Sequence, residues 1–186
     1  MKGRGTAVPR TPATMDILAK PLTAAAFAPW GEVLEAIGPP DKLINQGLCG
    51  RFHDRAALDF GPGGAVGRAG ISVFLAEART LPYRLEMVER HPLGSQAFLP
   101  MTDAPFLVIV AEGDDATPGP IHAFLTNGAQ GINLRRGAWH GVLTPLRAPG
   151  LFAVVDRIGP EGEPGAANLE EHWLPRPLTV QAGIAG

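Results

Sequence analysis

The sequence has little cysteine, almost no net charge and no long apolar run, and each absence excludes something. Only one of its 186 residues is cysteine, Cys49, so an intrachain disulfide is impossible and the cytoplasm is the expected compartment. The formal net charge of −2, with no run rich in lysine or arginine, argues against a nucleic-acid partner. No stretch approaches the roughly 20 apolar residues of a membrane-spanning helix, so no membrane partner is expected.

Changes in composition divide the chain into three parts. Residues 1–15 carry basic side chains with no apolar run behind them, so we expect a flexible N-terminal arm and no secretory signal. Residues 16–158 hold the patterned sequence and are predicted to form one barrel domain. Residues 159–186 are predicted to be a Gly/Pro-rich linker followed by a C-terminal tail that docks on the barrel, with Trp173 and Leu174 among the docking residues.

The middle of the chain has the pattern of short β-strands. Expected strands are apolar or alternating runs between turn sequences, which the 24 glycines and 19 prolines supply in number. They cover residues 32–37, 71–77, 83–91, 96–101, 106–112, 121–126, 131–136 and 151–158. One short helix, Ala24–Phe27, is expected after Thr23, which is a suitable N-cap. This spacing predicts an all-β, mainly antiparallel sandwich or barrel with a few short helices.

A segment with several polar residues, 89–101, covers the end of one predicted strand, the turn after it and the next predicted strand. Side chains alternate along a strand, so Glu89 and His91 share one face and Arg90 lies on the other. Gln96 begins the next strand, and antiparallel pairing would place it beside His91. These side chains suit a divalent metal, or an acid–base pair in which Glu89 supports His91. Solvated or ion-paired side chains are the structural alternative.

A second cluster of polar residues ends at His140. Gly137 lets the backbone bend so that His140 points inward, and Trp139 supplies an apolar wall. Asn127 is either a substrate contact or part of an Asn-Gly hairpin turn. His140 is either functional or a satisfied core residue. Two such clusters facing each other inside one barrel would form an active site.

The two clusters resemble a degenerate form of the two cupin motifs. Glu89-x-His91 and Gln96 occupy the first motif, with glutamate in place of its first histidine and glutamine in place of its carboxylate. Gly137-x-x-His140 occupies the second motif. This resemblance implies a cupin-like double-stranded β-barrel, or jelly roll.

Longer segments resemble the ureidoglycolate lyase family of allantoin catabolism. They are residues 89–101, 124–133 and 139–140, with 44–47 and 51–54 nearer the start. The resemblance implies a homodimer that cleaves ureidoglycolate to glyoxylate and urea. It also implies a possible divalent metal, with nickel the one associated with the family.

Such a lyase needs groups that move protons. We expect His91, supported by Glu89, to take the hydroxyl proton, directly or through a metal that acidifies it. His140 or His53 would then protonate the departing nitrogen. If a metal is present, the candidate ligands are His91, Glu89, Gln96 and His140.

The lyase must also hold the substrate carboxylate. Arg51 is the predicted anchor, because a guanidinium binds a carboxylate with two parallel hydrogen bonds. The other candidate substrate contacts are Asn45, Arg90, Asn127 and Trp139.

Two other functions fit a barrel of this kind. A non-enzymatic cupin-like barrel could bind a small carboxylate or sugar acid for sensing or storage. A metal-dependent oxygenase or isomerase could use the same barrel, although the usual His-x-His and carboxylate set is absent.

Overall fold

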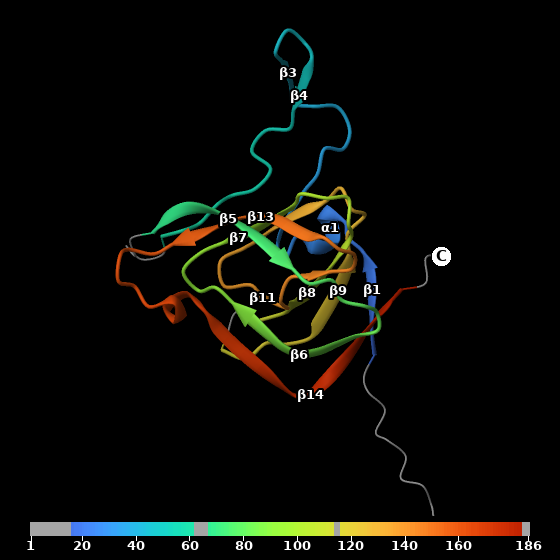
Figure 1. Cartoon of the computed structure of the whole chain (residues 1–186), viewed down its shortest axis with the longest axis vertical. Coiled ribbons are helices and arrows are strands. Elements are labelled where there is room, and N and C mark those ends of the chain that lie inside the picture. The colour runs from blue at the N-terminus through green and yellow to red at the C-terminus, as the bar shows by residue number, and fades with distance from the viewer. Residues whose placement is uncertain (1–15, 62–66, 114–115, 184–186) are drawn as a thin grey trace, which may run out of the picture.

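The computed structural model describes residues 16–61, 67–113 and 116–183, and these residues are mainly strands (Figure 1). Residues 1–15, the predicted N-terminal arm, lie outside the described residues. The strands are β1 (Asp16–Pro21), β2 (Gly31–Leu34), β3 (Lys42–Ile44), β4 (Cys49–Arg51), β5 (Arg68–Ala76), β6 (Tyr83–Arg90), β7 (Gln96–Pro100), β8 (Phe106–Ala111), β9 (Ile121–Leu125), β10 (Gly131–Leu134), β11 (Trp139–His140), β12 (Thr144–Pro145), β13 (Gly150–Ile158) and β14 (Glu170–Ala182). The helical elements are α1 (Ala24–Phe27) and the 3-10 turn η2 (Gly165–Asn168).

The predicted all-β, mainly antiparallel fold is confirmed. One sheet has the order β11-β6-β14-β1-β9-β8-β12, and β11 also pairs with β8, so this sheet closes on itself as a barrel. A second sheet has the order β2-β10-β7-β13-β5. The pairings of β1 with β14 and with β9 are parallel. The short helix is also where it was predicted, with the Thr23 hydroxyl accepting a hydrogen bond from the Ala26 amide at its start.

Two apolar clusters hold the sheets together. The first lies between the two sheets and includes Phe98 of β7, Val110 of β8 and Phe152 of β13. The second joins strands of the closed sheet and includes Val88 of β6 and Trp139 of β11. Strand β8 is buried along its whole length because its alternating side chains enter both clusters, which explains why its sequence is apolar throughout.

The C-terminal segment supplies a strand that the sequence did not predict. Strand β14 pairs with β6 on one side and with β1 on the other, so it is part of the closed sheet. Its register against β6 shifts between Trp173 and Leu178, where Pro175 and Pro177 cannot donate ladder hydrogen bonds. Leu174 packs against the second apolar cluster, whereas the Trp173 side chain is 64% exposed.

The segments before and after residues 92–95 do not form the hairpin that we predicted. Strand β6 pairs with β14 and β11 in the closed sheet, whereas β7 pairs with β10 and β13 in the other sheet. The turn between them therefore crosses from one sheet to the other. Gln96 does not reach His91 by ladder pairing. It meets His140 where the two sheets approach, and it contacts Asp156 on the neighbouring strand β13 of its own sheet.

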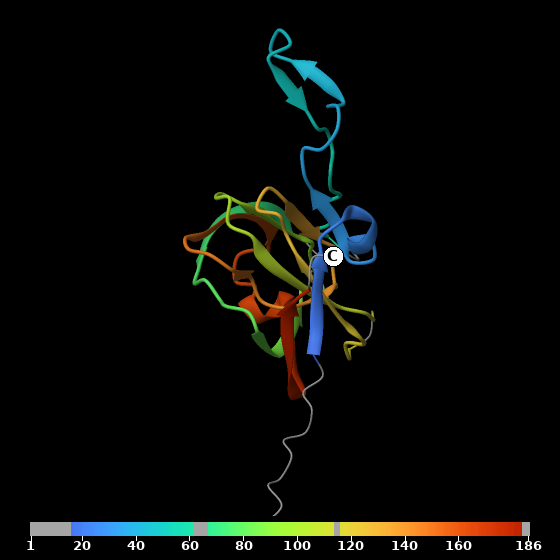
Figure 2. The same cartoon turned by 90° about the vertical axis from the view of Figure 1, so that its right-hand side faces the viewer.

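Of the strands that the structure describes, β3 and β4 pair only with each other and form a hairpin (residues 42–51). The hairpin stands away from the barrel in both views (Figures 1 and 2). At its tip, Asn45 and Gln46 have positive φ angles of 52° and 56°, followed by Gly47 at 87°. Among the described residues, no helix is long and apolar enough to cross a membrane.

Candidate active site

The two polar clusters meet where β6 and β11 pair. His140 lies opposite Glu89 in the antiparallel register. The turn before β11 is tied to the end of β6, because the Gly137 amide donates to the His91 carbonyl oxygen at 2.9 Å. Gly137 has a φ of 76°, a conformation that residues with a Cβ rarely adopt. The glycine thus permits the bend that brings His140 to Glu89 and His91, as predicted.

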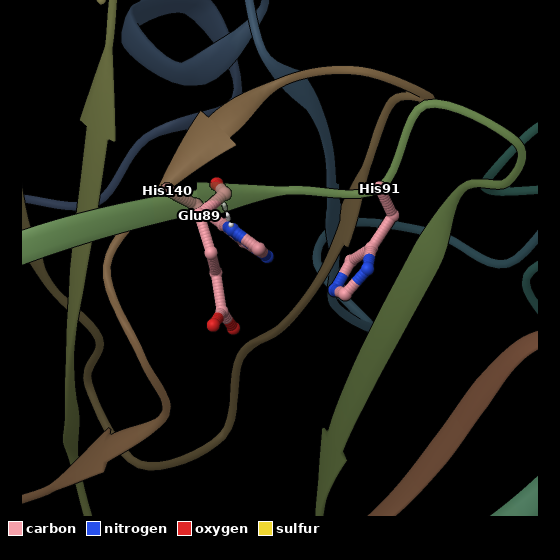
Figure 3. A group of neighbouring side chains, drawn as sticks. All are labelled: Glu89, His91 and His140. Atoms are coloured by element: carbon pink, nitrogen blue, oxygen red, sulfur yellow. Dashed lines mark hydrogen bonds between the residues drawn. The ribbon is translucent and has the colours of Figure 1, made fainter. Parts of the chain in front are cut away.

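Glu89, His91 and His140 form a compact group, which we call the triad. One ligand atom from each side chain lies within 4.8 Å of the others. The two imidazole rings are 5.3 Å apart between centroids and nearly perpendicular. Figure 3 shows the His140 ring directed toward His91, with the Glu89 side chain beside it. A carboxylate and two imidazoles at such distances can hold a divalent transition-metal ion.

Backbone carbonyls fix the protonation of both imidazoles. His91 Nδ1 lies 2.7 Å from the Asn168 carbonyl oxygen, and His140 Nδ1 lies 2.9 Å from that of Glu89. A carbonyl only accepts, so both Nδ1 atoms carry the proton and donate it. In the neutral rings each Nε2 then bears a lone pair. Outer hydrogen bonds of this kind typically orient metal-binding histidines.

The lone pairs at the triad need a positive charge or a proton. His91 Nε2 is buried and has no hydrogen-bond partner among the described residues. His140 Nε2 lies 3.4 Å from Gln96 Oε1, and the Gln96 amide group donates to the Asp156 carboxylate. Two acceptors therefore face each other, which is unfavourable unless a cation or proton lies near both. The donor set thus fits a bound metal.

Burial changes the acid–base properties of two triad members. Burial, helped by the charge of His91, lowers the pKa of His140 to about 3, so this imidazole is neutral near neutral pH. Burial also raises the pKa of Glu89, an effect that nearby His91 opposes and Glu171 reinforces. A neutral imidazole is the form that binds metals.

A cavity of about 390 Å³ opens beside the triad, and its walls include His91, Ser95, Gln96 and Asp156. Asp156 was missed in the sequence, because a single aspartate near the end of an apolar strand resembles an ordinary solvated residue. Its Oδ1 is buried with no hydrogen-bond partner among the described residues, and burial raises its pKa. It is the carboxylate that the β13 strand directs into this cavity.

Three predicted substrate contacts lie away from the triad. Arg90 points to the other face of β6, as the alternation of side chains along a strand predicted. There it pairs with Glu170 at 2.6 Å and lies over the ring of Trp139. Trp139 is 1% exposed and belongs to the second apolar cluster. Asn127 forms its turn, since its Oδ1 accepts from the Ala129 amide at 2.9 Å. Arg90 and Trp139 therefore support the strands that carry the triad.

The remaining predicted site residues, two substrate contacts and the candidate proton donor His53, lie on or next to the projecting hairpin. Asn45 is at the tip, Arg51 ends β4, and His53 follows it. All three are exposed. The hairpin that carries or adjoins them stands away from the barrel (Figures 1 and 2), so within this one chain it does not bring them to the triad.

The fold and site define a class of protein, namely an all-β, cupin-like barrel with a metal-binding donor set beside a small polar cavity. The sequence model of the ureidoglycolate lyase family matches residues 14–181. The chain belongs to the ureidoglycolate lyase family.

Curated relatives agree with this assignment over nearly the whole chain. The ureidoglycolate lyase of Rhodobacter capsulatus is 59% identical over 165 residues, which are 89% of this chain and 98% of that protein. The ureidoglycolate lyase of Chelativorans sp. is 47% identical over 164 residues, with 88% and 95% covered. Ureidoglycolate lyase 2 of Rhizobium meliloti is 43% identical over 162 residues, with 87% and 95% covered.

Proposed function

We propose that this chain is a ureidoglycolate lyase, a carbon–nitrogen lyase that eliminates urea from ureidoglycolate and leaves glyoxylate. The observation that carries the proposal is the triad of Glu89, His91 and His140 beside a polar cavity in a member of this family. The cavity volume of about 390 Å³ suits a substrate of this size.

The reaction itself sets the requirements of the site. Ureidoglycolate has a carboxylate, a hydroxyl and a ureido nitrogen on one carbon. The hydroxyl proton leaves, the carbon–nitrogen bond breaks, and the departing urea nitrogen gains a proton. The atoms balance without water. The site therefore needs a proton acceptor, a proton donor and a group that anchors the carboxylate.

We assign the triad, with Gln96 as a neighbouring donor, to a divalent metal, and nickel is the ion we propose. When bound, such an ion supplies Lewis acidity that makes the substrate hydroxyl easier to deprotonate. Support comes from the buried Nε2 lone pair of His91 and from the opposed acceptors of His140 and Gln96.

The chain's own proton carrier is Asp156 in this proposal. Its unpartnered Oδ1 is the acceptor for the hydroxyl proton, and the same carboxyl then returns a proton to the urea nitrogen. The raised pKa of Asp156, caused by burial, favours this exchange because the protonated form becomes more accessible. The neutral, Nδ1-protonated form of His140 has no proton on Nε2 to donate, so we give His140 a ligand role.

We further propose that the enzyme is a homodimer that works in the cytoplasm. The chain has a single cysteine, Cys49, which suits a reducing compartment. Exposed apolar side chains on β5, including Ile71 and Leu75, suit an interface between two copies.

A time course of urea and glyoxylate release from ureidoglycolate tests the proposed function. We expect the purified protein to release both products in equal amounts. Ammonia without urea would contradict the lyase and indicate amidohydrolase chemistry. Binding without any product would instead support a non-enzymatic barrel for small carboxylates, and stoichiometric tightly bound iron would support an oxygenase.

A further inference from the structure

The projecting hairpin stands away from the barrel of its own chain (Figures 1 and 2). Its two strands have three residues each, and a two-stranded hairpin alone is marginally stable in water. Leu43 and Leu48 are 60% and 87% exposed on it. Yet its base is clamped, because Asp41 accepts hydrogen bonds from the His53 amide at 2.8 Å and from Arg55 at 2.9 Å. Exposed leucines on a hairpin whose base is held by such hydrogen bonds are typical of a surface that contacts another molecule.

The hairpin also presents a ready carboxylate-binding pair. Arg51 donates to His53 Nδ1 at 2.8 Å, since arginine has no acceptor atom. The neutral His53 therefore carries its proton on Nε2, which is a second donor next to the guanidinium. Both side chains are exposed, so a carboxylate could reach them.

The cations near the triad are engaged by carboxylates of the same chain. Arg157 forms a two-pronged ion pair with Glu163, with nitrogen–oxygen distances of 2.6 and 2.9 Å. Arg136 pairs with Asp59 at 2.7 Å. Arg90, as described above, pairs with Glu170. These three arginines are therefore less open to a substrate carboxylate than Arg51 and His53, which are exposed.

An apolar surface for a second copy lies on the five-stranded sheet. Ile71, Val73 and Leu75 alternate along β5, share one face and are 79%, 65% and 74% exposed. In the antiparallel pairing with β13, Leu75 lies opposite Leu151 and Ile71 lies opposite Val155. Strand β5 is also the edge of its sheet, so among the described residues its outer backbone groups have no strand partner there. Long apolar edges of this kind pair with another chain.

Strand β13 links this surface to the cavity. Its apolar outward side chains lie beside β5, and its last residues, from Asp156 onward, line the cavity. A second copy that covers β5 therefore lies next to the cavity rim. In a twofold dimer each copy offers the other the same surface and the same hairpin.

We propose that two copies of this chain associate through the exposed face of β5 and β13, and that each hairpin completes the cavity of its partner. Arg51, with His53 beside it, binds the carboxylate of the substrate held in the other copy. The proposal rests on the proposed function for the identity of that carboxylate. It explains why these residues are exposed and distant from the triad of their own chain.

A heterodimer of two inactive variants tests the proposal. One chain carries Arg51→Ala and the other His91→Ala, each with a different affinity tag, and purification through both tags isolates the mixed dimer. One of its two sites then has both an intact triad and an intact partner hairpin. We expect about half of the wild-type activity per dimer, while each parent variant is nearly inactive. An inactive heterodimer would overturn the proposal, as would an Arg51→Ala parent with wild-type kinetics.

Glyoxylate binding, followed by calorimetry, gives a readout that does not require turnover. If the wild type binds glyoxylate but does not cleave ureidoglycolate, the proposed function fails while the shared site can still be tested. The wild-type dimer should bind two molecules and the heterodimer one. Equal binding by the wild type and the Arg51→Ala homodimer would overturn the shared site.

Val73→Asp tests the association surface. This side chain is 65% exposed, so a charge there should leave the fold intact and make the protein monomeric. Activity should fall together with the dimer. Arg84→Ala is the control, since this exposed arginine pairs with Glu86 on β6 and should leave dimer and activity unchanged. A fully active Val73→Asp monomer, or an undisturbed dimer, would overturn the proposal.

Discussion

The triad and the hairpin carry similar side chains in opposite surroundings. At the triad, His91 and His140 are oriented by carbonyl groups of their own chain, and His140 is 2% exposed. On the hairpin, Arg51 and His53 hydrogen-bond each other and are otherwise open to solvent. The first region is preorganised by one chain, whereas the second, in our proposal, becomes a site only when a second copy of the chain brings its cavity to the hairpin. Variants in the two regions should therefore fail in different ways.

The largest effect should come from the triad. We expect His91→Ala to lower kcat by about 10²–10⁴-fold, because it removes a metal ligand that nothing nearby replaces. The variant should also lose bound metal while keeping its circular dichroism spectrum. Near-wild-type turnover with full metal content would contradict the assigned role.

Asp156→Asn should separate proton transfer from metal binding. The amide keeps the shape and the contact with Gln96 but cannot accept a proton, so kcat should fall by about 10²-fold or more. Metal content, measured by mass spectrometry, should remain that of the wild type. Loss of metal together with activity would show that Asp156 belongs to the ligand set.

Arg51→Lys should produce a smaller effect of a different kind. Lysine keeps the charge but cannot bind a carboxylate with two parallel hydrogen bonds, so KM should rise by roughly tenfold while kcat changes little. Steady-state kinetics on ureidoglycolate measure both parameters. A fall in kcat with unchanged KM would place Arg51 in the chemical step and not in binding.

The last effect concerns the stability of the metal-free protein and not its turnover. The pKa of His140 is about 3 in the folded chain and near 6.5 when unfolded, so the unfolded state binds the extra proton between these values. The contribution of the neutral His140 to the free energy of unfolding is therefore complete above about pH 6.5. It decreases as the pH is lowered toward about 3, by up to about 1.4 kcal/mol per pH unit. Urea denaturation across this range should show a flatter dependence for His140→Gln. Equal slopes would mean that His140 is not buried as neutral imidazole.

Local patterns in the sequence predicted the all-β fold class and the members of the triad, and the resemblance to the two cupin motifs predicted that its two parts meet. Alternation placed Glu89 and His91 on one face, and Gly137 indicated the bend that brings in His140. These predictions depend on residues within a few positions of each other. The role of Arg90 as a support follows from the same alternation, because it places this side chain on the opposite face.

Contacts between distant segments could not be predicted in this way. Strand β14 was missed because Pro175 and Pro177 interrupt its pattern, and its pairing depends on β1 at the other end of the chain. Asp156 enters the site because β13 lies beside β7, which places it next to Gln96, and Gln96 in turn meets His140 of the other sheet. The segment around Arg51 was identified by resemblance, but its projection from the barrel has no signal in composition or periodicity.

Metal reconstitution tests most directly whether the triad is the reactive centre. The protein is stripped with a chelator, nickel is added back in steps, and bound metal and urea release are measured on the same samples. We predict one ion per chain, activity that rises in proportion to bound nickel, and neither binding nor recovery in His140→Ala. Full urea release by the stripped protein, or restored activity in that variant, would contradict the metal-binding role of the triad.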